Sequence, residues 1–510
     1  METANYAGEA LKYYLTFDLG TTSLKTALID DEGRVAAVHV EEYALITPRP
    51  DWAEMKAETY WQAAVAGARS VLVKSGADPK ALAAIGFSSQ GQTYIPIDKT
   101  GKALFNAIVW VDNRAQSIAD EWEAAWLPKD EYRRMSGYPW IPGGLTAFKV
   151  GWMARHVPEA LKAWKFLCLP DYLIYRLTGE TVTDHIIAQM NGFYDLRTRA
   201  WSPKMVAAAG ITEEQLPRIL EPGAKAGAVH AQAAVELGIP AGVPVCVGAN
   251  DQLVGAIGAG NVRPGIVSET TGTALALVAT TDALLDDDRV FVAHHAVPGL
   301  SYAMAFTITS AIVLKWFRDL TAPGTSYDEF LQGVGEVPPG CGGLTVLPHF
   351  AGTASPTYNP NVRGAFSGLT LGHTRAHIAR AIMESCACML RECLECVTGH
   401  GIALAGVRSM GGAARNDLWL QMKADLLGVP VERPACTDAG SLGAAMLAAA
   451  GIGRFNGITE AADAWYRTDR TFEPNPANYA AYREVYGRYL GLYNQLYGQL
   501  PSATTPVASS

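Results

Sequence analysis

Two turns built from Gly, Thr and Ser, one in each half of the chain, most constrain how this sequence folds. The first follows an apolar run as Asp18-Leu19-Gly20-Thr21-Thr22-Ser23, and the second is Glu269-Thr270-Thr271-Gly272-Thr273. An acidic residue at a strand end, followed by such a turn, presents backbone N–H groups and hydroxyls to phosphate oxygens. The Asp18 carboxylate can hold a hydrated Mg²⁺ beside them, because that ion keeps most of its waters. The repetition predicts a nucleotide held between two duplicated halves.

The length of 510 residues favours at least two domains. Each half opens with strands and closes with helices, which predicts an α/β architecture with mixed sheets. A Gly- and Pro-containing connector, Gly260 to Gly265, marks the seam. We therefore expect an N-terminal domain over residues 1–260 and a C-terminal domain over residues 261–510.

Charge and hydropathy exclude two classes of partner. The net charge of -9 and the pI near 5.6 argue against a nucleic-acid backbone, which needs a basic face. Met1 to Ala10 contains two Glu and no basic run, unlike a secretory or mitochondrial signal. The uncharged stretch Ala439 to Gly453 is short for a membrane span and indicates a buried helix. We expect a cytoplasmic protein without membrane contact.

Four of the eight cysteines cluster as Cys386, Cys388, Cys393 and Cys396. A metal site is one interpretation of this spacing. The apolar residues around them recur at helical intervals, however, whereas metal-binding Cys pairs usually sit on turns. The pattern therefore favours small core residues of a long helix over His377 to His400.

Asp251 stands where the predicted strand Pro244 to Gly248 gives way to a helix over Gln252 to Gly258. It can cap that helix, a role for which Asp is favoured and which Asn250 could share. It can also be a general base that accepts the proton of a hydroxyl attacking a γ-phosphate. Both roles are compatible, because a helix N-terminus favours phosphate.

Polar residues follow two further predicted strands. Ala84 to Phe87 leads to Gln90-Gly91-Gln92, and Ile108 to Val111 contains Trp110 and leads to Asp112-Asn113-Arg114. Strand ends of this kind usually bind the ligand in α/β proteins. An aromatic face with donors and acceptors suits a polyhydroxylated ligand, and a surface turn with an Asp–Arg pair is the alternative interpretation.

A third glycine-containing turn, Gly411 to Asn416, precedes an amphipathic helix over Asp417 to Leu427. It is either a capped turn or a flat surface for adenine, with Asn416 bonding the nucleoside. The GxxxxGK[ST] and GxGxxG fingerprints are both absent from the sequence. Nucleotide binding of those two kinds is excluded.

Taken together, these residues resemble the FGGY carbohydrate kinases, within the superfamily of actin, hexokinase and heat-shock ATPases. One family signature matches Gly144 to His156, including Lys149 and Trp152. A second matches Gly364 to Leu369 and continues through His377-Ile378 and Ala381 to Glu384. The likeness covers nearly the whole chain. It implies two actin-like (ribonuclease H-like) domains around a central cleft, with sugar and phosphate binding in the first and nucleotide binding in the second.

The resemblance also implies roles for individual residues. Asp251 matches the catalytic Asp, which also contacts the sugar, and Asp18 matches the Asp that holds Mg²⁺ through water. The matching ATP and phosphate contacts are Thr21, Thr22, Ser23, Gly272, Thr273, Gly412 and Asn416. The expected sugar contacts are Gln90, Gly91, Gln92, Trp110, Asp112 and Arg114. ATP, Mg²⁺ and a small sugar are the implied ligands, and a homodimer is the default expectation.

Within the family, Asp171 to Glu180 and Trp110-Val111-Asp112-Asn113-Arg114 resemble xylulokinases. The chain departs from them at Gly91-Gln92, where xylulokinases carry Met-His and glycerol kinases Arg-Glu. We expect ATP-dependent phosphorylation of a ketopentose such as D-xylulose. The alternatives are a kinase for ribulose or for a polyol such as erythritol and, outside the class, a non-catalytic sugar or nucleotide sensor or an actin-like ATPase.

Overall fold

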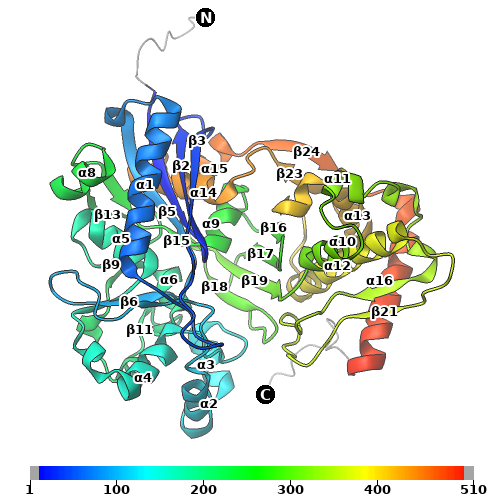
Figure 1. Cartoon of the computed structure of the whole chain (residues 1–510), viewed down its shortest axis with the longest axis horizontal. Coiled ribbons are helices and arrows are strands. Elements are labelled where there is room, and N and C mark those ends of the chain that lie inside the picture. Colours follow the sequence, from blue (N-terminus) through cyan, green and yellow to red (C-terminus); the bar gives the residue numbers. More distant parts are fainter. Residues whose placement is uncertain (1–10, 499–510) are drawn as a thin grey trace, which may run out of the picture. The chain divides into compact units, whose positions relative to one another are not determined.

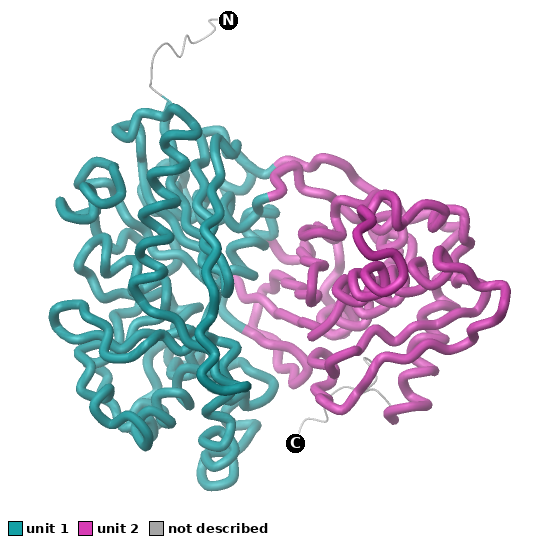
Figure 2. Tube along the Cα trace, in the orientation of Figure 1, with its two compact units in different colours: residues 1–262, 293–299, 438–466 teal, residues 263–292, 300–437, 467–510 magenta. Residues whose placement is uncertain are grey.

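The computed structural model describes residues 11–498, and Figure 1 shows their helices and strands. The chain forms two compact units, coloured separately in Figure 2. Unit 1 contains the residues up to 262 together with residues 293–299 and 438–466. Unit 2 contains residues 263–292, 300–437 and those from 467 onward. The first crossing, after residue 262, lies inside the predicted connector Gly260 to Gly265 and two residues after the predicted boundary at residue 260. Residues 438–466 belong to unit 1 although they come late in the sequence.

The central sheet of unit 1 has the strand order β13-β14-β5-β1-β2-β3, and β15 also pairs with β5. β2 is antiparallel to both β1 and β3, whereas β5 is parallel to both β1 and β14. The strands are β1 (Tyr13–Leu19), β2 (Ser23–Asp30), β3 (Val35–Glu42), β5 (Leu82–Ser89), β13 (Lys225–Ala228), β14 (Pro244–Cys246) and β15 (Ala249–Asn250).

The central sheet of unit 2 repeats this pattern, with the order β18-β19-β17-β16-β22-β23-β24. β16 is antiparallel to β17 and β17 to β19, while β22 is parallel to β16 and to β23. Both units therefore share one core topology, in which the first strand and its hairpin partner are joined by one of the two predicted phosphate turns. The strands are β16 (Ile266–Thr271), β17 (Leu275–Thr281), β18 (Phe291–His294), β19 (Ser301–Thr307), β22 (Gly406–Met410), β23 (Val431–Pro434) and β24 (Thr468–Phe472).

Smaller sheets complete the strand structure. They comprise β4 (Glu54–Met55), β7 (Ala107–Ile108), β6 (Tyr94–Ile97) and β8 (Lys165–Cys168) in one sheet, and the pairs β10 (Tyr194–Asp195) with β11 (Ala200–Trp201), β9 (Val182–Asp184) with β12 (Arg218–Leu220), and β20 (Thr345–Leu347) with β21 (Ala365–Ser367).

Helices pack beside the sheets of each unit (Figure 1). Those of unit 1 are α1 (Ala57–Ser75), α2 (Gln116–Ala125), α3 (Lys129–Ser136), α4 (Thr146–His156), α5 (Leu169–Thr178), α6 (His185–Met190), α7 (Pro203–Ala208), α8 (Ala231–Leu237), α9 (Asp251–Gly258), α14 (Ala439–Gly451) and α15 (Ile458–Trp465). Those of unit 2 are α10 (Ala311–Thr321), α11 (Tyr327–Phe330), α12 (Arg375–Thr398), α13 (Asp417–Leu427) and α16 (Pro476–Tyr497).

The clustered cysteines lie on α12, as the helical spacing predicts. Cys386 and Cys388 pack in one hydrophobic core of unit 2, and Cys393 and Cys396 in the other. All four are at most 1% exposed. The prediction that they are small core residues is confirmed, since each thiol fills space between the helix and its neighbours.

Glycines let α14 pack closely against α9 within unit 1. A Cβ on Gly443 would lie 1.9 Å from the Val254 carbonyl oxygen, and one on Gly258 would lie 1.9 Å from that of Ala439. Such distances exclude any side chain, so the two helix backbones touch. This contact fixes the position of α9, whose first residue is Asp251. It also explains why a late segment belongs to the first unit.

One predicted strand is shorter than expected. The sequence predicts a strand over Ile108 to Val111, whereas β7 ends at Ile108. The Trp110 amide donates to the Thr93 hydroxyl at 3.1 Å instead of to a neighbouring strand. Trp110 and Val111 consequently lie on a turn and are 42% and 37% exposed.

Among the described residues, no helix is both long and apolar enough to span a bilayer.

Candidate active site

The ends of neighbouring strands bring two predicted site residues together in unit 1, Asp251 as the expected catalytic residue and Asp18 as the expected Mg²⁺-binding residue. β1 and β15 both run parallel to β5, with Asp18 and Ala249 each paired with Ser88. Because the carboxyl ends of parallel strands meet at one edge of a sheet, Asp18 and Asp251 lie near each other. Their electrostatic interaction appears in the pKa of Asp251, which the Asp18 charge raises.

Two neighbours, Ser88 and Lys25, hold the Asp18 side chain. Its Oδ1 accepts a hydrogen bond from the Ser88 hydroxyl at 2.7 Å, and its Oδ2 lies 3.7 Å from Lys25 Nζ. Lys25 also binds Asp438, the N-cap of α14, at 3.1 Å. Burial raises the pKa of Asp18, against the opposing effect of the Lys25 charge. A single carboxylate, one quarter exposed, fits a hydrated Mg²⁺ better than a directly caged ion.

Asp251 is the first residue of α9, and Asn250 rather than Asp251 is its N-cap. The Gln252 backbone amide donates to Asp251 Oδ1 at 2.8 Å, and also to the Asn250 side chain at 3.1 Å. Burial is the main reason that the pKa of Asp251 rises to about 7, and the Asp18 charge is the second. A carboxylate tuned to neutral pH is suited to take a proton from an alcohol.

The first phosphate turn is supported by residues that the sequence assigned to the sugar. Gln90 donates from Nε2 to the Gly20 carbonyl oxygen at 3.1 Å, and Thr21 donates to Gln90 Oε1 at 3.4 Å. The Trp110 indole N–H donates to the Thr21 hydroxyl at 2.8 Å. The turn and the exposed Trp110 ring therefore form one continuous surface. Thr22 lies on the same turn, and Ser23 is the first residue of β2.

Gln92 occupies an unusual backbone position beside this surface. Its φ is +60°, a region that side-chain-bearing residues rarely adopt. Its amide donates to the Tyr138 hydroxyl at 2.8 Å, while its carbonyl oxygen accepts from Thr146 at 3.2 Å. Gly91 leaves no spare room, because a Cβ there would lie 3.0 Å from Met190 Sδ. The loop is fixed by packing, and strain at such a position is common at functional sites.

Lys149, from the first family signature, contacts the loop that carries Gln92. It is fully buried and donates to the Val109 carbonyl oxygen at 2.8 Å. Its Nζ also lies 3.5 Å from the Gln92 carbonyl oxygen. Burial lowers the pKa of Lys149 to about 7. The residue therefore joins the loop of Gln92 to the turn that carries Trp110.

Asp112 and Arg114 form a buried cluster with Glu54. The Arg114 guanidinium lies 2.7 Å from Asp112 and 2.8 Å from Glu54, and it stacks 3.8 Å from the Trp52 ring. Asp112 Oδ2 also accepts from the Ala53 amide at 2.6 Å. Neither residue lies on an exposed surface, so their contacts stabilise the turn after Trp110. A direct sugar contact for them stays a prediction.

Unit 2 contains a cavity of about 610 Å³ at the second phosphate turn. Its lining includes the phosphate turn, the glycine turn after β22, and residues of α10, α11 and α13. Among these residues are Thr271, Gly272, Thr273, Ile312, Lys315, Tyr327, Gly412, Asn416 and Trp419. The size fits a nucleoside with its phosphates. All four residues predicted to bind the nucleotide in this unit line it.

The glycine turn gives this cavity a flat wall. Gly411 has φ of +79°, and a Cβ there would lie 3.0 Å from the Thr271 carbonyl oxygen. At Gly412 a Cβ would meet nothing within 4 Å, so the face above it is open. Asn416 caps α13 by accepting from the Trp419 amide at 2.9 Å. Both interpretations of this turn, a helix cap and an adenine surface, are compatible with its geometry.

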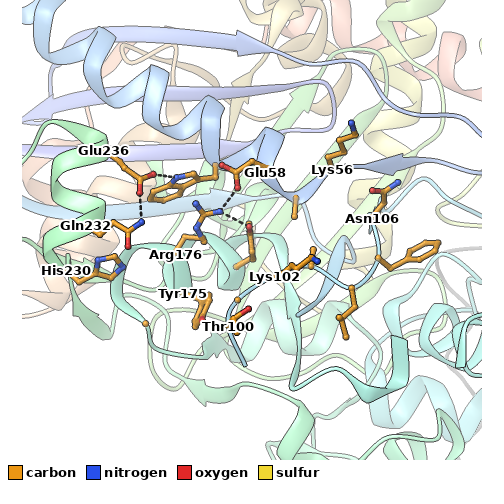
Figure 3. A pocket seen from close by; sticks show the side chains of 18 residues that line it. Lys56, Glu58, Thr100, Lys102, Asn106, Tyr175, Arg176, His230, Gln232 and Glu236 are labelled. Atoms are coloured by element: carbon orange, nitrogen blue, oxygen red, sulfur yellow. Dashed lines mark hydrogen bonds and ion pairs between the residues drawn. The ribbon is translucent and has the colours of Figure 1, made fainter. Parts of the chain in front are cut away.

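A larger cavity, of about 770 Å³, lies elsewhere in unit 1 (Figure 3). There Arg176 stacks 4.4 Å from the Trp61 ring and pairs with Glu58 at 2.8 Å. Trp61 in turn donates to Glu236 at 2.6 Å. None of the predicted site residues lines this cavity. Cavity size alone therefore does not locate the site.

Sequence reasoning missed Lys25, Ser88 and Asp438, which set the charge around Asp18. Lys25 was visible from strand alternation, because residues 23, 25 and 27 share one face of β2. In the antiparallel pair Asp18 lies directly opposite Lys25. Asp438 was not recoverable in this way, since it comes from a segment more than four hundred residues along the chain.

Comparison with known proteins identifies the class. Residues 13–258 match the N-terminal domain, and residues 266–452 the C-terminal domain, of the FGGY family of carbohydrate kinases. The chain belongs to this family and is a carbohydrate kinase, a phosphotransferase with an alcohol group as acceptor. The predicted α/β fold of two actin-like domains is confirmed by the solved structures that it matches.

Its relatives act on different substrates. A glycerol kinase of Solidesulfovibrio magneticus is 34% identical over 91% of this chain and 95% of its own length. A xylulose kinase of Bacillus subtilis is 29% identical over 95% of this chain and 97% of its own. The gluconate kinase structure from Lactobacillus acidophilus has a TM-score of 0.88 and 27% identity, covering 96% and 98% of the two chains. Overall similarity therefore leaves the acceptor open.

Proposed function

We propose that this protein transfers the γ-phosphate of ATP to a terminal hydroxyl of a ketose, with a ketopentose such as D-xylulose as the preferred acceptor. The observation that carries the proposal is Asp251, a carboxylate at a helix N-terminus whose pKa rises to about 7 beside a second carboxylate, Asp18. Unit 2 supplies the nucleotide cavity with its phosphate turn. ATP as donor agrees with the family and with the ADP named for a glycerol kinase structure of the same fold.

In this proposal Asp251 accepts the proton of the attacking hydroxyl. The Asn250 side chain and the Gln252 amide orient that carboxylate. Thr21 and Thr22 of unit 1 offer hydroxyls to phosphate oxygens. Gly272 and Thr273 of unit 2 offer backbone N–H groups and a hydroxyl to phosphate oxygens of the nucleotide. A Mg²⁺ held through water by Asp18 would neutralise charge on the phosphates. Lys25 would keep Asp18 ionised for that purpose.

The preference for a ketopentose has two supports. Trp110 exposes 42% of its surface next to the phosphate turn, which suits the apolar face of a sugar. The Bacillus subtilis xylulose kinase matches nearly the full length of the chain. The segment from Asp171 adds little to this preference, because Asp171 helps to cap α5 and the later residues Tyr172, Tyr175, Arg176 and Gly179 line the 770 Å³ cavity, which contains none of the predicted site residues.

Glycerol is the second candidate, since a glycerol kinase is 34% identical to the chain. The argument against glycerol is the loop that carries Gly91-Gln92, where glycerol kinases have Arg-Glu. The Gln92 amide binds Tyr138, so this loop presents no charge to a small triol.

The test is ADP release from Mg-ATP with D-xylulose, D-ribulose, erythritol, glycerol and D-gluconate. We expect kcat/KM to be at least tenfold higher for one ketopentose than for glycerol, the discrimination that about 1.4 kcal/mol gives. A maximum at glycerol, erythritol or gluconate would reject the ketose and keep the kinase. ADP release without any dependence on an acceptor would favour an ATPase.

A further inference from the structure

Behind the second phosphate turn, four fully buried side chains form a closed polar network. Glu269 and Thr271 come from β16, Ser409 from β22 and Lys423 from α13, and each is 0% exposed. Lys423 Nζ lies 2.5 Å from Glu269 Oε1, 3.0 Å from the Thr271 hydroxyl and 3.1 Å from the Ser409 hydroxyl. Thr271 donates to Glu269 Oε2 at 2.6 Å, and Ser409 donates to Glu269 Oε1.

Every polar atom at the centre of this network has a partner. A lysine ammonium has three N–H donors, and the three oxygens around Lys423 match them one for one. Both Glu269 oxygens also accept hydrogen bonds. Neither Lys423 nor Glu269 lines the nucleotide cavity. The pair therefore does not contact a nucleotide in that cavity. Any effect on nucleotide binding passes through Thr271 and Ser409, which Lys423 contacts.

The residues that it holds lead directly into the cavity. Thr271 is followed by the phosphate turn Gly272-Thr273, and Ser409 lies two residues before the glycine turn. Glu269 is paired with Ser409 across the parallel ladder of β16 and β22. Lys423 lies two helical turns after Asn416, the N-cap of α13. One ion pair thus joins the phosphate turn, the glycine turn and the helix that carries Asn416.

We propose that the buried Glu269–Lys423 pair is a positioning device that sets the distance between the phosphate-binding and nucleoside-binding walls of the unit 2 cavity. The inference rests on the nucleotide role proposed above for that cavity. A fully buried ion pair adds little net stability compared with apolar residues, because desolvation offsets the attraction. Its geometric constraint is a separate effect, and a misplacement of about 1 Å in a binding site is costly.

The test compares variants of the full-length protein by titration calorimetry with MgADP and by thermal unfolding. Lys423→Met removes the tie and leaves Glu269 charged and unpaired, whereas E269Q/K423M removes the tie and both charges. The matched control is Glu384→Gln. It breaks another buried pair of unit 2, Arg380–Glu384 at 2.9 Å on α12, which does not line the cavity.

We expect both Lys423→Met and E269Q/K423M to weaken MgADP binding by about tenfold or more, a 1.4 kcal/mol effect. The double variant should regain most of the unfolding temperature that Lys423→Met loses, since no charge is left unpaired. KM for the sugar should stay within twofold. Glu384→Gln should lower the unfolding temperature and keep the ADP affinity of the wild type.

Two results would overturn the inference. The first is a double variant that regains ADP affinity together with stability, because the pair would then only balance charge. The second is a Glu384→Gln variant with the same loss of affinity, because the effect would then reflect general destabilisation. Failure of the wild type itself to bind MgADP would instead reject the proposed nucleotide site, and the positioning role with it.

Discussion

Replacement of Asp251 by Asn tests the proposed base most directly. The change keeps the size of the side chain and its contacts with α9 but removes the proton acceptor. A lost general base typically costs about a hundredfold or more, so kcat for the best acceptor should fall by at least that factor. The folded structure should persist, because the Asn250 cap remains in place.

The pH dependence follows from the raised pKa of Asp251, about 7 against the ordinary 3.8. The base must be ionised to act, so activity rises with pH. At pH 6 about one tenth of Asp251 is ionised and at pH 8 about nine tenths, which predicts a rise in kcat/KM of roughly tenfold. A Mg²⁺ beside Asp18 would shift the midpoint of this activity profile to lower pH. The ion would offset the Asp18 charge, which helps to raise the pKa of Asp251.

The same shift has the opposite effect on stability. Between pH 4 and 7 the folded protein holds a proton on Asp251 that the unfolded chain has lost, so stability falls as pH rises through this window. Asp251→Asn removes the cost of the buried charge. The variant should be more stable than the wild type at pH 8, by roughly 2 kcal/mol given the partial exposure of the side chain, and equally stable near pH 4.

The assays are coupled ADP release at pH 5.5–9 and thermal unfolding at pH 4, 6 and 8 without metal. A variant that retained a tenth of the wild-type kcat would refute the general base. A variant with reduced activity but no stabilisation at pH 8 would refute the raised pKa. Asp18→Asn is the control in the metal-free unfolding series. It removes the charge that helps to raise the pKa of Asp251, so stability should fall less between pH 4 and 8 than in the wild type.

Four further predictions concern two glycines, the Gln92 loop and the metal. Gly443→Ala should destabilise unit 1 by several kcal/mol in chemical unfolding, because its Cβ would lie 1.9 Å from the Val254 carbonyl oxygen. Gly487→Ala on α16, where a Cβ meets nothing within 4 Å, should be neutral or stabilising by up to about 1 kcal/mol. Gln92→Ala, which removes the hydrogen bond from the Gln92 amide to the Tyr138 hydroxyl, should raise KM for the sugar about tenfold and leave KM for ATP unchanged. Equal changes in both would contradict the assignment. Chelation by EDTA should abolish ADP release and excess Mg²⁺ should restore it, whereas full activity in EDTA would contradict the role given to Asp18.

Local sequence patterns predicted most of the elements around the site. The helix over Asp417–Leu427 begins and ends where the sequence places it, because Asn416 and Gly428 are strong local boundary signals. The phosphate turns and the Asp251 helix were likewise visible as short motifs. Ile108 to Val111 was misassigned as a strand because the bond from Trp110 to Thr93, which ends β7, is not a local signal.

Local sequence alone specified the motifs of the candidate site. They are the two predicted phosphate turns, the carboxylate of Asp251 at the start of one helix, and the glycine turn before another. Those features depend on neighbouring residues, and local backbone preferences fix them. The charged residues that contact these motifs could be identified only from the folded structure. Lys25 and Asp438 meet at Asp18, and Glu269 meets Lys423, across 413 and 154 residues of chain. Such pairs are set by how strands and helices pack, and no local pattern encodes that distance.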